Sequence, residues 1–237
     1  RELMDLFRAV LQSGEKSERV LELTEEILDI NAANYTVWQY RRETLFSLNY
    51  DLNIEMDYMD TFAEENPKNY QIWFHRRVVV ERLGDSSREL PFTASVFLVD
   101  AKNYHAWSHR QWVLTAFSLW EENELEFVDA MLEMDIRNNS AWNYRWFFLH
   151  GTDACAARPV TEDRVESEIA FTFRAIEKVK LNESAWNYLT GLRKKYRDVM
   201  PVVTSLSIDD RLASMLERFD VENVKCYFLW EALADIA

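Results

Sequence analysis

The chain has 237 residues and a formal net charge of −14, and 48% of its residues are hydrophobic. Glycine and proline contribute 4 residues each, 8 of 237 or about 3%, against roughly 12% in an average protein. This scarcity argues against folds that turn often, such as β-sandwiches, β-barrels and doubly wound α/β sheets. The 14% aromatic content argues against a disordered chain, and the acidic balance makes nucleic acid a poor partner.

Hydrophobic periodicity predicts amphipathic helices that occur in pairs. A short leading helix contains Phe7 and Val10. The first helices of the later pairs are expected at 17–30, 51–65, 86–99, 121–134, 161–178 and 207–219. Short polar loops, with the sequences NAAN, NPKN and DAKN in the first three pairs, follow these helices, and their Asn or Asp residues suit the N-cap of the second helix. The segment 151–160 is rich in small residues, and we expect an exposed excursion there.

The second helices carry an internal repeat that is centred on a tryptophan. The repeated tryptophans are Trp38, Trp73, Trp107, Trp142 and Trp186, with spacings of 35, 34, 35 and 44 residues. An asparagine stands four residues before each tryptophan. An arginine stands three residues after the first four, namely Arg41, Arg76, Arg110 and Arg145, and Leu189 replaces it in the fifth. A fixed period of this length is typical of stacked helical units.

The repeat predicts an all-α fold, a right-handed α-α superhelix of about six helical hairpins with a crescent shape. Residues 1–237 are expected to form a single helical-repeat domain, with a degenerate sixth unit near Trp230. A tryptophan at the same place in each unit is expected to fill the space between hairpins. For the arginine three residues later, a buried carboxylate or carbonyl partner is favoured over contact with a ligand.

Stacked repeats place equivalent loop residues along one edge of the solenoid. Five residues before the tryptophans stand Ala33, Lys68, Lys102, Arg137 and Leu181. Three consecutive repeats therefore present a cation beside helix N-termini, which already favour anions. The row fits a diphosphate or carboxylate site, and it also fits ordinary solvated surface charge. Both interpretations remain open at this point.

Self-contained catalytic motifs are not found in the sequence. His105 and His109 have the i, i+4 spacing of metal ligands, but the glutamate of HExxH is missing, so no metal site is expected. Cys155 and Cys226 show no metal or redox spacing and are expected to be reduced thiols. The chain has no apolar run of about 20 residues and no signal peptide, so we expect a cytoplasmic protein without a transmembrane segment.

The repeats NPKNYQIWFHRR, DAKNYHAWSHRQW, IRNNSAWNYRWF and NESAWNYL resemble those of protein prenyltransferase α subunits. The resemblance covers nearly the whole chain. Within that family, the block DAKNYHAW at 100–107 resembles the members shared by protein farnesyltransferase and geranylgeranyltransferase type I. The family's proline-rich N-terminal extension and much of its C-terminal region are missing, so a truncated or compact variant is expected.

The resemblance implies roles for individual residues. Lys102 matches the family lysine that reaches across the subunit interface to the isoprenoid diphosphate, where it would stabilise the charge on the leaving group. The resemblance also implies substrate-binding and supporting positions. The expected substrate-binding residues are Tyr70, Tyr104, His105 and Asn138, and the expected supporting residues are Arg110, Trp142 and Arg145.

The resemblance further implies an enzyme that is active only as a heterodimer with a β subunit. The implied reaction transfers a prenyl group from farnesyl or geranylgeranyl diphosphate to the cysteine thiol of a C-terminal CaaX sequence. No cofactor is expected on this chain, zinc is expected in the β subunit, and magnesium can accompany the diphosphate. The alternative is a non-catalytic helical-repeat scaffold that binds a protein partner, and the effect of replacing Lys102 distinguishes the two.

Overall fold

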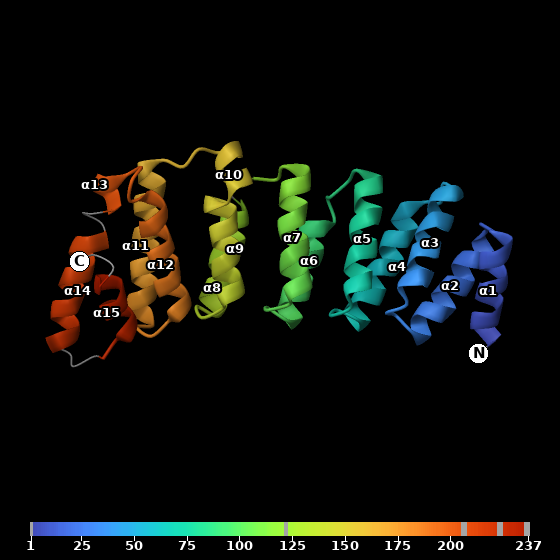
Figure 1. Ribbon diagram of the computed structural model, residues 1–237, viewed down its shortest axis with the longest axis horizontal. Helices are drawn as coiled ribbons and strands as arrows, with labels where there is room; N and C mark the ends of the chain where they lie inside the picture. Colours follow the sequence, from blue (N-terminus) through green and yellow to red (C-terminus); the bar gives the residue numbers. More distant parts are fainter. Residues whose placement is uncertain (1, 121–122, 205–207, 222–224, 235–237) are drawn as a thin grey trace. The chain divides into compact units, whose positions relative to one another are not determined.

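The computed structural model describes residues 2–120, 123–204, 208–221 and 225–234, and within them the regular secondary structure is helical (Figure 1). In chain order the helices are α1 Glu2–Ser13, α2 Glu18–Ile30, α3 Tyr35–Ser47, α4 Leu52–Glu65, α5 Tyr70–Leu83, α6 Glu89–Val99, α7 Tyr104–Phe117, α8 Asn123–Met134, α9 Asn139–His150, α10 Thr152–Ala157, α11 Glu162–Lys178, α12 Glu183–Tyr196, α13 Pro201–Thr204, α14 Asp210–Val221 and α15 Tyr227–Ala234.

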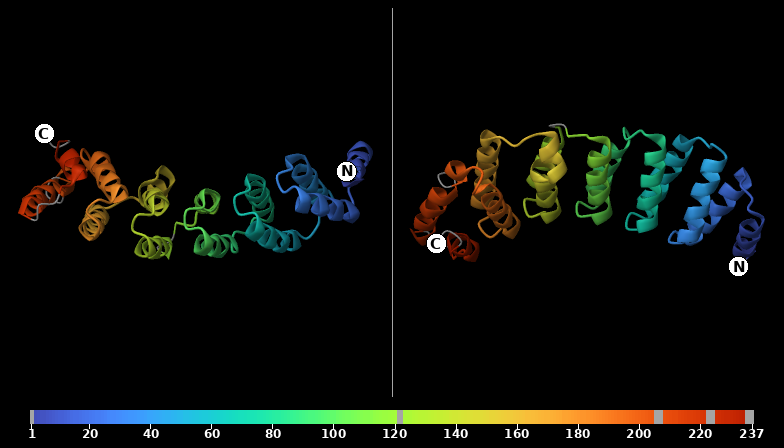
Figure 2. Two further views of the ribbon diagram at one scale, coloured as in Figure 1. Left: turned by 90° about the horizontal axis from the view of Figure 1, so that it is seen from below. Right: turned by 45° about the horizontal axis from the view of Figure 1, so that its top comes forward.

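The chain forms two compact units, residues 1–117 and 118–237. In the first unit, α2 packs on α3, α4 on α5 and α6 on α7, while α1 packs on α2. The second helices α3, α5 and α7 stand side by side (Figures 1 and 2). In the second unit the pairs are α8 with α9, α11 with α12 and α14 with α15. The predicted all-α fold of stacked helical hairpins is therefore confirmed within each unit, while the single domain over 1–237 stays a prediction.

Most predicted first helices have the expected bounds. The helix predicted at 86–99 begins three residues late, at Glu89, because residues 86–88 form a turn in which the Glu89 amide donates to the Ser86 carbonyl at 3.0 Å. The exposed excursion expected at 151–160 was wrong in part. It contains the helix α10, which packs on α9 and buries Ala154, and the Arg158 guanidinium lies 4.5 Å from the centre of the Phe148 ring.

Predicted N-caps are confirmed at most of the repeated asparagines. Side-chain oxygens of Asn34, Asn69, Asn103 and Asn138 accept hydrogen bonds from backbone amides in the first turn of the following helix, at 2.9–3.4 Å. These contacts satisfy amide groups that a helix cannot pair by itself. The short Asn-led loops therefore end one helix and start the next without glycine.

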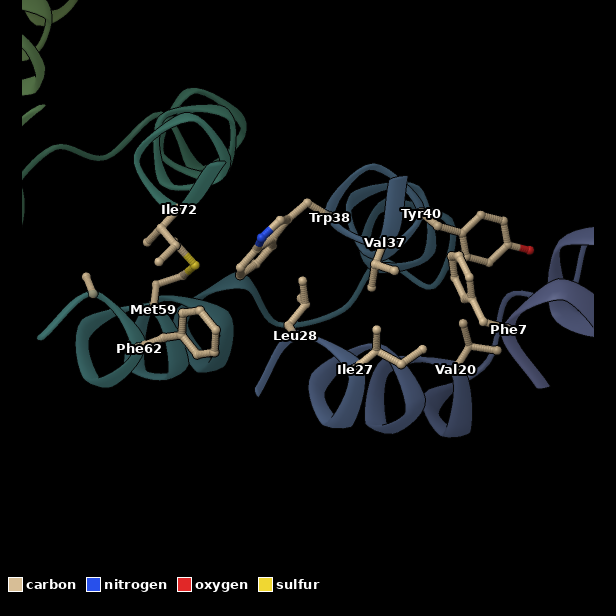
Figure 3. Packing of buried hydrophobic residues seen from close by; sticks show 11 residues of the cluster. Phe7, Val20, Ile27, Leu28, Val37, Trp38, Tyr40, Met59, Phe62 and Ile72 are labelled. Atoms are coloured by element: carbon tan, nitrogen blue, oxygen red, sulfur yellow. The ribbon is translucent and has the colours of Figure 1, made fainter. Parts of the chain in front are cut away.

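The repeated tryptophans lie in the core, as predicted. Trp38 packs between α3 and the α4 residue Phe62, with ring centroids 5.5 Å apart, and Figure 3 shows Met59 and Ile72 beside it. Burying a ring of this size contributes about 4–6 kcal/mol of transfer free energy. Each of the five repeated indole Nε1 atoms also donates to the carbonyl six residues earlier, at 2.8–3.0 Å. The tryptophans thus tie each second helix to its own loop.

The degenerate sixth unit keeps part of this pattern. Cys226 stands four residues before Trp230, in the position of the repeated asparagine, and immediately precedes α15. Its thiol donates to the Lys180 carbonyl at 3.4 Å, and that carbonyl also accepts from Trp186 Nε1. The Trp230 side chain is 56% exposed, unlike the other repeated tryptophans, and Leu229 is the buried residue of this helix.

Candidate functional site

The repeated arginines lie in the interior and bind carboxylates of the following repeat, as the sequence favoured. Arg76 of α5 forms a two-pronged ion pair with Glu89 of α6, with Nε and Nη2 at 2.9 and 2.7 Å from the two carboxylate oxygens. Its Nη1 reaches Asp60 at 2.5 Å. His109 of α7 adds a third contact, with Nε2 2.5 Å from Glu89 Oε2. Glu89 therefore joins three helices of two successive repeats.

The same arrangement recurs around two other buried glutamates. Glu55 of α4 accepts from Arg41 at 2.8 and 2.7 Å and pairs with His75 Nε2 at 2.7 Å. Glu168 of α11 accepts from Arg145 at 2.7 and 2.6 Å. The hydroxyl of Tyr188 also donates to Glu168, at 2.9 Å. Two-pronged pairs of this kind fix both distance and orientation, so they set the register of neighbouring hairpins.

These contacts decide the protonation of the buried groups. Burial alone raises the pKa of Glu55, but the hydrogen bonds from His75 and Arg41 outweigh it and lower that pKa to about 2. Burial lowers the pKa values of His75 and His109 below their usual range. Each imidazole is therefore neutral, and because a carboxylate only accepts, Nε2 carries the proton that is donated to the glutamate. The network is a buried structural element in which no histidine is available to a metal.

The glutamates of this network escaped the sequence reasoning although a signal for them exists. Four glutamates, Glu55, Glu89, Glu124 and Glu168, stand 18 residues before the tryptophan of their own repeat. The first repeat has Val20 at this place. Its tyrosine, Tyr40, donates instead to the backbone carbonyls of Val10 and Glu15 at 3.3 and 2.9 Å. The 18-residue spacing was therefore readable as a partner for the repeated arginine.

Lys102 is exposed on a loop whose backbone is held on both sides. Asp100 Oδ1 accepts from the Lys102 amide at 3.1 Å. Ala101 presents its carbonyl to Trp107 Nε1 at 3.0 Å. The Asn103 side chain caps α7 at the Ala106 amide and donates to the Pro67 carbonyl of the preceding loop, both at 3.0 Å. A long flexible cation thus projects from a fixed backbone next to a helix N-terminus, which is an arrangement suited to an anion.

Aromatic side chains lie along the same edge of the first unit. Tyr70 and Tyr104, which begin α5 and α7, are 63% and 77% exposed. His105 lies between them in partly buried surroundings, with its ring centre 6.2 Å from that of Tyr70 and 5.7 Å from that of Tyr104. These four predicted residues, Lys102 included, therefore occupy two neighbouring repeats, while the predicted supporting residue Arg110 is buried and donates to the Leu90 carbonyl at 2.7 Å.

The other predicted residues belong to the second unit. Asn138 is buried, and its side-chain oxygen accepts from the Ser140 amide at 3.0 Å as the cap of α9. Trp142 is buried and donates to the Ile136 carbonyl, and Arg145 is engaged by Glu168 and Asp129. Arg110, Trp142 and Arg145 thus lie where a supporting role is plausible in physical terms. Substrate binding by Asn138, whose side chain already serves the helix, stays a prediction.

Metal and thiol chemistry find little in the described residues. Over 2–120, 123–204, 208–221 and 225–234, no group of three or more His, Cys, Asp and Glu side chains is placed to hold a metal ion. His109, one of the i, i+4 pair, is committed to Glu89. Cys155 and Cys226 are free thiols. Among the helices in these parts of the chain, none is long and apolar enough to cross a membrane.

Comparison with known proteins gives relatives over nearly the whole chain. The chain is 35% identical over 233 residues to the protein farnesyltransferase/geranylgeranyltransferase type-1 subunit alpha of Candida albicans, covering 94% of this chain and 71% of that protein. It is 45% identical over 222 residues to the subunit of the same name in Arabidopsis thaliana, covering 93% and 66%. In structure it is similar to Candida albicans protein geranylgeranyltransferase-I complexed with GGPP, with a TM-score of 0.86, 32% identity and coverage of 99% of this chain and 77% of that chain.

The family model described as the protein prenyltransferase alpha subunit repeat matches five segments, residues 17–48, 52–83, 86–117, 121–151 and 165–196. Each matched segment corresponds to one helical hairpin around a repeated tryptophan, and the network of arginines and glutamates links these hairpins. The predicted resemblance is thus confirmed, and the chain belongs to the family of protein prenyltransferase alpha subunits.

Proposed function

We propose that this chain is the α subunit of a heterodimeric protein farnesyltransferase/geranylgeranyltransferase type I. In the complex with a β subunit, a prenyl group would pass from farnesyl or geranylgeranyl diphosphate to the cysteine thiol of a C-terminal CaaX sequence. The observation that carries the proposal is the likeness, at a TM-score of 0.86 over 99% of this chain, to a geranylgeranyltransferase-I complexed with GGPP. The 35% and 45% identity to the two subunits described above supports the same assignment.

Lys102 is the residue that we assign to the diphosphate. As the bond between C1 of the prenyl group and the diphosphate oxygen breaks, negative charge accumulates on the leaving diphosphate. A cation positioned beforehand stabilises this charge more than it stabilises the bound substrate, and this difference accelerates the reaction. The fixed backbone of residues 100–103 supports this role, because only the lysine side chain has to be ordered.

The neighbouring aromatic residues have a supporting part in the proposal. Tyr70, Tyr104 and His105 would line the path of the substrates at this edge, since their rings are partly or largely exposed beside Lys102. Zinc that activates the thiol would be held by the β subunit, and magnesium can accompany the diphosphate. We place the activity in the cytoplasm, where the two free thiols of this chain would stay reduced.

The proposal is tested with Lys102→Ala in the complex co-purified with the β subunit. We expect prenyl transfer to a CaaX peptide to fall by about 100-fold, which is the effect of removing one preorganised charge-stabilising group. The matched control is Lys16→Ala, which removes a lysine of the same unit that pairs with Glu43 at 2.9 Å. Unchanged turnover in Lys102→Ala with the heterodimer intact would remove Lys102 from the mechanism. Full activity of this chain without a β subunit would overturn the heterodimer itself.

A further inference from the structure

The cations of the predicted loop row are engaged in different ways. Lys68, in the loop before α5, places its Nζ 3.4 Å from Asp100 Oδ2 in the loop before α7. The other oxygen of this carboxylate accepts from the Lys102 amide at 3.1 Å. Asp100 is therefore contacted by one lysine through its side chain and by the next through its backbone. The two lysines occupy equivalent places in the sequence repeat but have distinct surroundings.

Asp100 also belongs to the framework of the loop. Its amide donates to the Val96 carbonyl at 2.9 Å, and its carbonyl accepts from the Asn103 amide at 3.0 Å. The Asn103 side chain in turn donates to the Pro67 carbonyl, adjacent to Lys68. Two contacts thus join the loop of Lys102 to the preceding loop, one between neutral groups and one between charged side chains.

The charge of Asp100 opposes the proposed task of Lys102. A carboxylate that touches the backbone of Lys102 lowers the positive potential around that residue and competes with a diphosphate for its ammonium group. A second cation on the far carboxylate oxygen cancels this effect. Lys68 is in the right place to do so, and its side chain is 79% exposed while that of Asp100 is 33% exposed.

We propose that Lys68 is a positioning residue that acts through Asp100: it neutralises this carboxylate and thereby leaves the charge of Lys102 available to the prenyl diphosphate. Asp100 holds the backbone of Lys102 with one oxygen and binds Lys68 with the other. In this arrangement Lys68 does not touch the diphosphate. The inference rests on the proposed role of Lys102 and assigns a cause to the pairing of the two loops.

The test is a double-mutant cycle in the heterodimer, with the dissociation constant for geranylgeranyl diphosphate and the kcat and KM of peptide prenylation as readouts. Lys68→Met leaves Asp100 uncompensated and should weaken diphosphate binding about two- to fivefold, the range that exposed ion pairs give. In an Asp100→Asn background, where an acceptor for the Lys102 amide is kept and the charge is gone, Lys68→Met should change binding by less than about 1.5-fold. Lys68→Arg should restore the parent value.

Salt and a control variant separate this electrostatic role from a structural one. The effect of Lys68→Met should shrink as ionic strength rises from about 0.05 to 0.5 M, because exposed charges are screened. Lys16→Met, which breaks the pair with Glu43 in the same unit, should leave diphosphate binding unchanged. Equal losses from Lys68→Met with and without Asp100→Asn would overturn the inference and indicate direct contact of Lys68 with the diphosphate. No loss from Lys68→Met would also overturn it, whereas no loss from Lys102→Ala would overturn the proposed function itself.

Discussion

The buried carboxylate Glu89 allows the contribution of the inter-repeat network to be measured. Glu89→Ala removes the partner of two buried groups at once, the Arg76 guanidinium and His109 Nε2. Removing one member of a buried ion pair costs about 3–5 kcal/mol because the remaining charge stays desolvated. Arg76 keeps its contact with Asp60 at 2.5 Å, and that carboxylate is 35% exposed and partly screened. We therefore expect a loss near the lower limit, about 3 kcal/mol.

The assay is urea unfolding of the purified complex followed by tryptophan fluorescence, with the change in midpoint converted through a common m-value. The control is Glu81→Ala, which removes a carboxylate of α5 that pairs with Arg77 at 3.2 Å where both side chains are about half exposed. Exposed i, i+4 pairs contribute less than about 1 kcal/mol. A loss below 1 kcal/mol for Glu89→Ala, or one equal to that of Glu81→Ala, would refute the reasoning that the buried pair links the repeats.

Two further predictions concern the second unit. Burial lowers the pKa of His150 to about 3, and the neutral ring lies between the hydroxyls of Tyr196 and Tyr188 at 2.8 and 3.1 Å. The unfolded chain takes up this proton below pH 6.5, so this part of the stability is complete above pH 6.5 and is lost toward pH 3, with a slope of up to about 1.4 kcal/mol per pH unit. His150→Gln should reduce that slope in urea midpoints measured from pH 7.5 to 5, and an unchanged slope would contradict the assignment. Cys226→Asn should raise the midpoint by about 0.5–1.5 kcal/mol, because an amide can donate to the Lys180 carbonyl and cap α15; a lower midpoint would show that the site accepts only the thiol.

The helical hairpins and their caps could be predicted because they depend on residues close together in the chain. An asparagine four residues before a tryptophan is sufficient to indicate a loop, a cap and the start of a helix, and the structure has these elements in order. The short helix α10 was missed because the segment 151–160 carries small residues with weak hydrophobic periodicity. Its placement depends on contact with α9, which local sequence does not report.

The partners of the buried arginines depend on contacts between helices and were harder to infer. Arg41 and Glu55 are 14 residues apart, whereas Arg145 and Glu168 are 23 apart, so no fixed distance in sequence joins the two groups. The constant spacing lies between each glutamate and its own tryptophan, and it becomes informative only when the stacking of hairpins is known. For the same reason, the repeat places Lys68 and Lys102 in equivalent positions, while the structure distinguishes them through Asp100.

The interior and the edge of each repeat together explain how a solenoid can hold a single lysine for catalysis. Buried pairs such as Arg76 with Glu89 fix the register of neighbouring hairpins, and the fixed register allows loop contacts such as Asn103 with Pro67 to form. Ordering the backbone of a free loop costs about 1–2 kcal/mol per residue, so the four residues 100–103 would oppose binding by about 4–8 kcal/mol if they were mobile. With that backbone already held, a diphosphate has to order only the Lys102 side chain, at a cost of about 2 kcal/mol. Weakening the inter-repeat contacts should therefore reduce catalysis even where the lysine itself is unchanged.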